Sequence, residues 1–438
     1  MILELIHAYG TDKLTVEESI GDYLSRIEEL DDQFKAIIHK NERALDDARE
    51  LDHYKKKTNK LKGKLHGVPV VLKANIETND SMPTSCGSVL LKDHFSNKNA
   101  EIVKWLISEG AVILGKSNMS EWSNYVSSSS ESGYSSLGGQ TICIYGSQHP
   151  VGGSSSGSAV AVAASFCLLA FGTETDGSVV YPAAHNGVYA FKNSPGRFPT
   201  LGIKGISTFF DTIGFYTRSL EDLKFITDIL YQHSLDEQSF GTVFIEENSF
   251  TLSDQSKNVL LELKSALNNN SINYNMGTFF QEIDPYFEFM DIICQTEFKN
   301  NITSTINFTS KEFLESCRKN LLQEFYKDIN EIERSFSSNF DLSGEYSNAK
   351  ERILQKRSEK QFLMAKEGID FIIAITLGPS DISSIAMILG LPHLVVPVST
   401  GEFLPIGISI IGSVKKEEMM FKLAEILRLH LNGSKLEI

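Results

Sequence analysis

Apolar residues recur at helical spacing near the start of the chain. Thr15 and Glu18 stand three residues apart, as in a capping box, which predicts the start of a helix. The apolar positions that follow at spacings of three and four are Ile20, Tyr23, Leu24, Ile27 and Leu30. A second helix is expected over about residues 42–51.

Short uninterrupted apolar runs mark buried strands further along. They are predicted at residues 68–72, 111–114, 168–172, 371–376, 393–398 and 406–411. Helices are expected at 158–167, which is rich in small residues, and at about 416–431, which is amphipathic. Apolar strands that alternate with helices indicate an α/β sheet with helices on both faces. We therefore expect a single large α/β domain with a central mixed β-sheet.

Two stretches interrupt this pattern. Residues 127–157 are rich in serine and glycine, which is also typical of a flexible linker between domains. A helix and a strand follow directly, however, and linkers do not usually alternate so regularly with core elements. The middle of the chain, about residues 220–365, is polar and predicted to be helical.

Composition and charge exclude several classes of protein. The chain has 438 residues and a net charge of −15, which argues against a nucleic-acid binding surface. No apolar run approaches the roughly 20 residues that span a bilayer, and the first residues lack the pattern of a signal peptide. The five cysteines are scattered without CxxC spacing, so we expect reduced thiols and a cytoplasmic protein. The ten histidines form no HxH or HExxH pair, and we expect neither a metal nor a cofactor.

Three short segments contain the candidate chemistry. In the first, residues 67–75, Lys73 closes a buried strand, although burial of an ammonium group is costly. Taken alone, a lysine that reaches solvent at the strand end is the simpler interpretation.

In the third segment, residues 172–184, a strand runs into a tight turn that ends at Ser178. Successive backbone N–H groups in such a turn can bind an oxyanion.

The second segment, residues 152–158, contains a misleading motif. Gly153-Ser154-Ser155-Ser156-Gly157 fits the GxSxG pattern of a nucleophile elbow. Such an elbow needs a buried strand before it, and residues 146–151 look like a loop, so we reject that interpretation. A helix N-terminus that merely binds an anion remains as the alternative.

Together the three segments resemble the amidase signature family. That family has a Gly-Gly-Ser-Ser-rich segment, then Gly-Thr-Asp-x-Gly-Gly-Ser, then a proline with small residues. The spacing between Ser154 and Ser178 and the lysine on a Gly-Val-Pro strand agree with it. Further agreement covers nearly the whole chain but is weak in the middle: residues 48–52, Phe191-Lys192, residues 211–214, Arg218-Ser219, residues 390–392 and residues 405–412.

The resemblance implies a role for each of these residues. Ser178 becomes the nucleophile, Ser154 a relay serine on a cis peptide bond, and Lys73 the base. The backbone N–H groups of an oxyanion hole come from Thr175, Asp176, Gly177 and Ser178. Supporting positions are Gly153, Ser155 and Glu174, while Ser155 and Ser156 remain rivals to Ser154 for the relay role. A lysine can take the serine's proton only when it is neutral, which burial favours.

The resemblance also implies how the chain is divided. We expect one amidase-type domain over residues 1–438. Its parts are N-terminal helices in 1–60, a catalytic core in 61–220, a variable helical substrate region in 221–365, and C-terminal strands and a helix in 366–438.

Four positions depart from the family pattern. Glu174 stands where the family usually has Asp, Asp176 where it has Gly, Val180 where it often has Arg, and Ala74 where Asp commonly follows the lysine. With valine at position 180, Glu174 lacks its expected cationic partner. A negative Asp176 opposes an oxyanion unless its side chain points away or pairs with a cation.

Three functions remain open at this point. The first is hydrolysis of a small-molecule or peptide amide through an acyl-enzyme, at a non-peptide or terminal C–N bond. The second is the ammonia-transferring A-type component of a tRNA-dependent amidotransferase, although no Gly-rich segment for reading glutamine is found before Asp370. The third is a catalytically impaired scaffold. A homodimer also remains open. Four middle-region aromatic residues either line an acyl pocket or, as helical patterns more often indicate, pack in a core: Phe298, Phe308, Phe313 and Phe325.

Overall fold

The computed structural model describes residues 1–231, 240–251, 253–279, 284–305, 308–322, 324–378, 382–398 and 404–431. Eleven of its strands are β1 (Ile37–Lys40), β2 (Pro69–Lys73), β3 (Val112–Ser117), β6 (Leu169–Glu174), β7 (Tyr189–Lys192), β8 (Thr212–Thr217), β9 (Thr242–Glu246), β10 (Tyr274–Gly277), β11 (Ile369–Ile375), β12 (His393–Val398) and β13 (Ile406–Gly412). In this described part they form one sheet in the order β1-β3-β2-β6-β8-β7-β12-β13-β11-β9-β10. A separate hairpin joins β4 (Tyr134–Ser135) to β5 (Gly139–Gln140).

The sheet is mixed. β2 runs parallel to β3 and β6, and β9 runs parallel to β10 and β11. The strands between these two groups pair antiparallel. The expected α/β class with a central mixed sheet is therefore confirmed.

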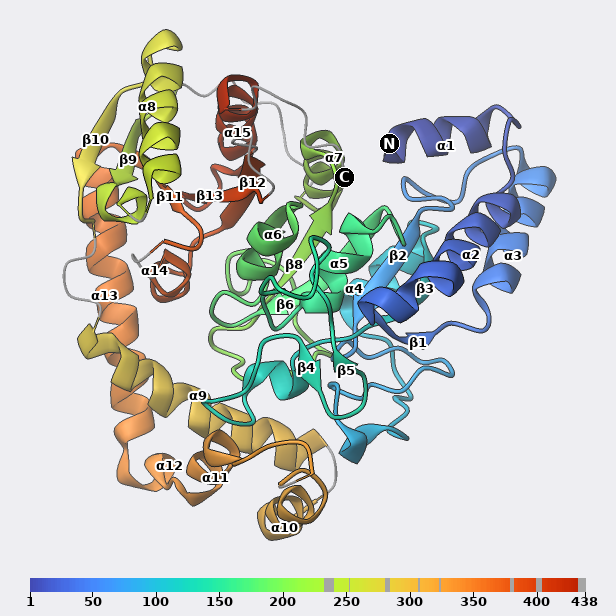
Figure 1. The fold of residues 1–438 in the computed structure, drawn as a ribbon, viewed down its shortest axis with the longest axis horizontal. Helices are drawn as coiled ribbons and strands as arrows, with labels where there is room; N and C mark the ends of the chain where they lie inside the picture. Colours follow the sequence, from blue (N-terminus) through green and yellow to red (C-terminus); the bar gives the residue numbers. More distant parts are fainter. Residues whose placement is uncertain are drawn as a thin grey trace.

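Helices cover both faces of the sheet (Figure 1). The N-terminal and central helices are α1 (Ile2–Gly10), α2 (Val16–Phe34), α3 (Ala44–Thr58), α4 (Glu101–Ser108), α5 (Ser156–Ala163), α6 (Val180–Asn186), α7 (Leu220–Tyr231) and α8 (Asp254–Asn269). The later ones are α9 (Asp284–Thr305), α10 (Ser310–Asn320), α11 (Asn330–Ser337), α12 (Phe340–Ser343), α13 (Glu345–Glu367), α14 (Ile382–Leu389) and α15 (Glu417–Leu431). Short 3-10 turns are η1 (Val89–Leu91), η2 (Glu121–Asn124) and η3 (Glu247–Phe250). No described helix is long and apolar enough to cross a membrane.

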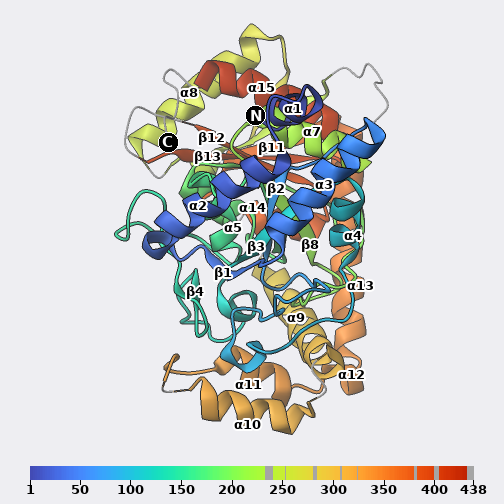
Figure 2. The same ribbon diagram turned by 90° about the vertical axis from the view of Figure 1, so that its right-hand side faces the viewer.

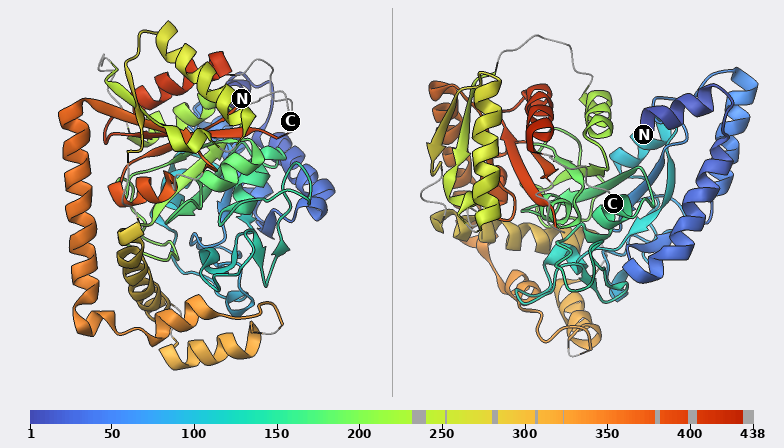
Figure 3. Two further views of the ribbon diagram at one scale, coloured as in Figure 1. Left: turned by 60° about the vertical axis from the view of Figure 1, so that its left-hand side comes forward. Right: turned by 45° about the horizontal axis from the view of Figure 1, so that its top comes forward.

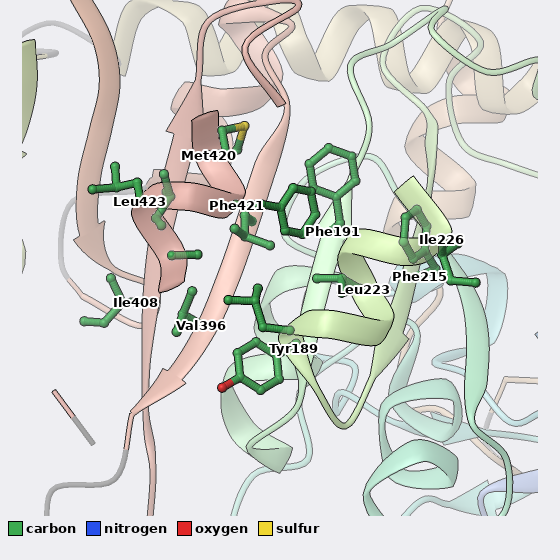
Figure 4. Packing of buried hydrophobic residues seen from close by; sticks show 14 of the residues in the cluster. Tyr189, Phe191, Phe215, Leu223, Ile226, Val396, Ile408, Met420, Phe421 and Leu423 are labelled. Atoms are coloured by element: carbon green, nitrogen blue, oxygen red, sulfur yellow. The ribbon is translucent and has the colours of Figure 1, made fainter. Parts of the chain in front are cut away.

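Alternate residues of the central strands belong to two different cores. On β6, Leu169 and Phe171 belong to the core that includes residues of α4, α7, α8 and α15, whereas Ala170 belongs to the core that includes residues of α2, α3, α5 and α6. Both faces are buried, which explains why the strands appear in the sequence as continuous apolar runs. Figure 4 shows the first core, where the rings of Phe191 and Phe421 lie 5.7 Å apart.

The start of the helix α2 agrees with the sequence pattern. Thr15 Oγ1 accepts the Glu18 N–H, and the Glu18 carboxylate accepts the Thr15 N–H. The predicted capping box is therefore confirmed.

The middle region is only partly helical, which corrects the expectation for residues 221–365. It contains β9 and β10, which extend the sheet beyond β11. Apolar runs as short as β9 and β10 do not distinguish a strand from a helix in the sequence alone. Helices α10 and α11 lie at the end of the molecule opposite α8 and α15 (Figure 2), and α13 runs along one side (Figure 3). Residues 232–239, 252, 280–283, 306–307 and 323 of this region, and 379–381, 399–403 and 432–438 of the C-terminal part, lie outside the described residues.

Candidate active site

Lys73 ends strand β2 in the interior of the protein. It is fully buried, so the alternative of a lysine that reaches solvent is wrong. Its Nζ lies 2.7 Å from Ser154 Oγ, 3.0 Å from Thr173 Oγ1 and 3.2 Å from the Thr173 carbonyl oxygen. Burial lowers the pKa of Lys73 to about 7, although the negative charge of Asp211 opposes this effect. A substantial fraction of the amine is therefore neutral near neutral pH.

The segment from Gly152 to Ser155 runs past this lysine as a loop before α5. A cis bond was expected on either side of Ser154, and it is the peptide bond between Gly153 and Ser154 that is cis. The hydroxyl of Ser155 donates to the Thr173 carbonyl oxygen at 3.1 Å, and that of Ser156 donates to the Gly152 carbonyl oxygen at 2.6 Å. Of the three serines, Ser154 therefore places its hydroxyl against Lys73.

The segment that contains Ser178 lies directly beside this loop. The Ser155 N–H donates to the Ser178 carbonyl oxygen at 3.0 Å, although a helix and a strand separate the two residues in the chain. Ser178 is 7% exposed, in the turn between β6 and α6. The sequence-predicted Lys73, Ser154 and Ser178 segments therefore meet at one place in the fold.

Glu174 organises the turn between β6 and α6. Its Oε2 accepts the N–H groups of Val179 and Val180 at 2.6 and 3.0 Å. Burial raises the pKa of the Glu174 carboxyl, and the charge of Lys192 lowers it. Valine at position 180 thus leaves Glu174 Oε2 with backbone donors, whereas its buried Oε1 has no hydrogen-bond partner among the described residues. Lys192 acts on Glu174 through its charge, and no ion pair of Glu174 replaces the expected cationic partner within the described part of the chain.

Asp176 is tied to helix α14. Its Oδ1 accepts the Ser383 hydroxyl at 2.7 Å, and its Oδ2 accepts the Ser384 hydroxyl at 2.6 Å. Ser383 Oγ also lies 2.6 Å from the hydroxyl of Tyr181. Both carboxylate oxygens of Asp176 therefore accept hydroxyl groups of α14.

Gly177 requires a conformation that other residues rarely adopt. Its φ is +79°, and a Cβ there would lie 2.2 Å from Cε2 of Tyr181. A glycine is thus needed for the turn to pass Tyr181.

Three residues of the site were not identified as functional candidates from the sequence. Thr173 contacts Lys73, and its Oγ1 also accepts from Asn75 Nδ2 at 3.0 Å. Asp211 accepts the Thr175 hydroxyl at 2.5 Å. Thr173 and Asn75 lie within quoted motifs and Asp211 begins another, but only their contacts reveal what their side chains bind.

A pocket of about 470 Å³ is bounded by residues that contact Asn75 and Asp211, while Lys73, Ser154 and Ser178 are not among its lining residues. It includes Lys204, whose carbonyl oxygen accepts from Asn75 Nδ2, and Gly205, which packs on Asp211. Apolar lining comes from Leu91, Trp122, Leu201, Ile203, Phe298 and Ile302.

The four middle-region phenylalanines pack together in one core. Phe298 and Phe313 are buried in it, and Phe308 and Phe325 pack against it. The rings of Phe298 and Phe313 each meet Trp122 edge-on. Phe298 also lines the pocket, so it fits both interpretations that the sequence left open. Among the described residues, no group of three or more His, Cys, Asp or Glu is arranged to hold a metal ion.

Comparison with known proteins places this geometry in a family. The family model described as "Amidase" matches residues 18–282, more than half of the chain. A putative amidase of Schizosaccharomyces pombe is 35% identical over 230 residues, which are 52% of this chain and 39% of that protein. The aligned part thus spans well under half the length of that relative.

Two other matches cover nearly the full chain. The A-type component of the glutamyl-tRNA(Gln) amidotransferase of Natranaerobius thermophilus is 28% identical over 99% of this chain and 96% of that protein. The crystal structure of a peptide amidase from Stenotrophomonas maltophilia has a TM-score of 0.85 and 26% identity, covering 98% of this chain and 96% of the other. The chain therefore belongs to the amidase signature family.

Proposed function

We propose that the chain hydrolyses a carboxylic amide through an acyl-enzyme on Ser178. In this mechanism Lys73, in its neutral form, takes a proton from Ser154 while Ser154 takes one from Ser178. The Ser178 oxygen attacks the amide carbonyl, and the protonated Lys73 returns the proton through Ser154 to the leaving nitrogen. Water then hydrolyses the ester and regenerates the three groups.

The observation that carries this proposal is the contact between the buried Lys73 and Ser154. A serine hydroxyl is a weak nucleophile unless a neighbour accepts its proton. An amine whose pKa is lowered to about 7 can accept it at physiological pH. The backbone bond between Ser155 and Ser178 supports the placement of the nucleophile beside this pair.

The turn supplies the oxyanion hole in this proposal. The N–H groups of Thr175, Asp176, Gly177 and Ser178 are assigned to the developing negative charge. Support comes from Glu174, which accepts the N–H groups of Val179 and Val180, and from α14, whose Ser383 and Ser384 hydroxyls bind the Asp176 carboxylate. Gly153 and Ser155 are assigned to the support of Ser154.

We propose a terminal or non-peptide amide as the substrate class. The similarity to a peptide amidase structure over nearly the full chain favours peptides with a C-terminal amide as the first group to assay. The adjoining pocket, with Trp122 and Phe298 in its lining, favours an apolar or aromatic group on the substrate.

A fluorophosphonate probe and peptide mapping by mass spectrometry test this proposal. The wild type is expected to be labelled at Ser178, and Ser178→Ala is expected to lose labelling by at least about a thousandfold. Ser194→Ala is the matched control, because Ser194 is 6% exposed and Ser178 is 7% exposed. If the folded wild type is not labelled by the probe and cleaves no amide in a broad panel, the hydrolase proposal is wrong and the catalytically impaired scaffold is the remaining interpretation.

The second candidate is an ammonia-transferring component of an amidotransferase. The full-length similarity to such a component favours it. Glutamine hydrolysis that appears only in the presence of copurifying partner proteins would support this role. Amide hydrolysis by the isolated chain would support the free-standing amidase.

A further inference from the structure

Asp211, the residue directly before strand β8, is a buried carboxyl group that contacts the proposed oxyanion turn. It is 6% exposed. Its Oδ1 accepts the Thr175 hydroxyl at 2.5 Å, and its Oδ2 accepts the Ser207 N–H at 3.0 Å. A Cβ at Gly205 would lie 1.7 Å from Oδ2, so this carboxylate is closely packed.

We propose that Asp211 is a positioning residue for the reaction, which fixes Thr175 in the turn and supplies the negative charge that stabilises Lys73 when the lysine holds the serine's proton. This inference rests on the proposed function. Asp211 forms no bond to substrate in it. Its two effects act through Thr175 and through the charge on Lys73.

The charges around the two groups support the second effect. Although burial outweighs them, the charges of Asp211, Cys86 and Glu174 each raise the pKa of Lys73, and Asp211 has the largest effect of the three. The pKa of Asp211 is raised to about 7, chiefly by burial and in part by the charge of Glu297, while the hydrogen bonds from Thr175 and Ser207 and the charge of Lys73 act to lower it. The Cys294 thiol, on α9, also lies in the field of Asp211. A carboxylate that favours the ammonium form lowers the cost of moving the serine's proton onto a buried amine.

Glu297 on α9 holds the loop before Asp211 but does not contact the turn. Its Oε2 accepts the Ser207 hydroxyl at 2.6 Å and the Phe209 N–H at 2.9 Å. Its Oε1 accepts the Tyr346 hydroxyl at 2.5 Å and lies 3.7 Å from Lys350 Nζ. Glu297 is thus partly neutralised by Lys350, whereas Asp211 is the acidic group that accepts the Thr175 hydroxyl.

The charge effect is tested by titrating Lys73 itself. In protein labelled with ¹³C at the lysine ε-carbons, the Lys73 resonance is the one missing from Lys73→Met. In Asp211→Asn the Lys73 midpoint is expected to fall by about one pH unit or more, because the negative charge is gone. The pH profile of probe labelling should move the same way. An unchanged midpoint in a folded Asp211→Asn protein would overturn the charge effect.

The positioning effect is tested by a second pair of variants that leave Asp211 intact. Thr175→Val removes the hydroxyl, and we expect its labelling rate to fall about tenfold or more, with the Lys73 midpoint in place. Thr175→Ser keeps a hydroxyl and should recover most of the lost rate. Equal rates for the two variants would overturn the positioning role.

These measurements also separate the inference from the proposed function. If the wild type is never labelled at Ser178, the proposed function fails and the role of Asp211 in the reaction fails with it. The Lys73 titration would still show whether Asp211 controls the lysine's charge. If Ser178 is labelled but neither pair of measurements responds, the inference alone fails.

Discussion

The Nζ atom of Lys73 lies 2.7 Å from the Oγ atom of Ser154, although 81 positions separate them in the chain. The lysine ends a buried strand, and the serine lies in a loop that β6 and α5 hold against it. The buried amine therefore has a neutral hydroxyl as its hydrogen-bond partner. Burial lowers the pKa of Lys73 to about 7, so the lysine can lose its proton at moderate pH.

The rate of probe labelling should rise with pH. Only neutral Lys73 accepts the proton, and its pKa is lowered to about 7 by burial. We expect the second-order rate constant to increase between about pH 6 and pH 8 and then level off. A rate that falls as pH rises through this interval would contradict a neutral lysine base.

Lys73→Met should stabilise the protein against unfolding, most strongly at low pH. The folded-state pKa is depressed from 10.5 to about 7, so the unfolded chain binds more protons between these values. The buried Lys73 therefore costs no stability through its protonation above pH 10.5. As pH falls from 10.5 towards 7, this cost grows and lowers the free energy of unfolding of the wild type. We expect a gain on the order of a few kcal/mol below pH 7 that shrinks at higher pH. Thermal melts from pH 6 to pH 10 measure it.

The exposed Lys57→Met is the matched control for that experiment. It should leave the melting temperature nearly unchanged at every pH. A Lys73→Met protein that is less stable than the wild type at pH 6 would mean that the buried lysine is charged and well paired.

Ser154→Ala and Ser156→Ala should differ sharply in labelling rate. Both hydroxyls are buried, Ser154 in the loop before α5 and Ser156 at the first residue of α5. Ser154 contacts Lys73, whereas Ser156 contacts the Gly152 carbonyl oxygen. We expect a loss of about a hundredfold or more for Ser154→Ala, since members of a catalytic unit fail together. Ser156→Ala should retain most of the wild-type rate. The reverse order would transfer the relay role to Ser156.

Gly177→Ala should be far more damaging than Gly196→Ala. Both glycines have positive φ, +79° and +75°, so the backbone cost of a side chain is similar. Only the Cβ at position 177 meets a neighbour, Tyr181, while that at 196 meets nothing within 4 Å. We expect Gly177→Ala to lose labelling and to unfold at a lower denaturant concentration than Gly196→Ala. Similar losses would show that the contact with Tyr181 adds nothing.

The class of fold and the candidate residues could be predicted from the amino-acid sequence. Buried strands appear as continuous apolar runs because both faces of the sheet are covered, and β12 was predicted with the bounds it has, residues 393–398. The capping box at Thr15 is a local interaction over three residues, so it too was predictable. Lys73, Ser154 and Ser178 were identified because they lie in short motifs.

The way in which side chains from different motifs meet could not be predicted, because it depends on the packing of distant segments. Strand β9 pairs with β11, and β10 pairs with β9. A short segment such as β9 does not specify a partner as distant in the chain as β11. Asp176 is held by α14, and Asp211 reaches Thr175, through contacts between segments that are remote in sequence. The charge of Lys73 depends on its burial and on carboxylates from other segments, and both are properties of the packed molecule.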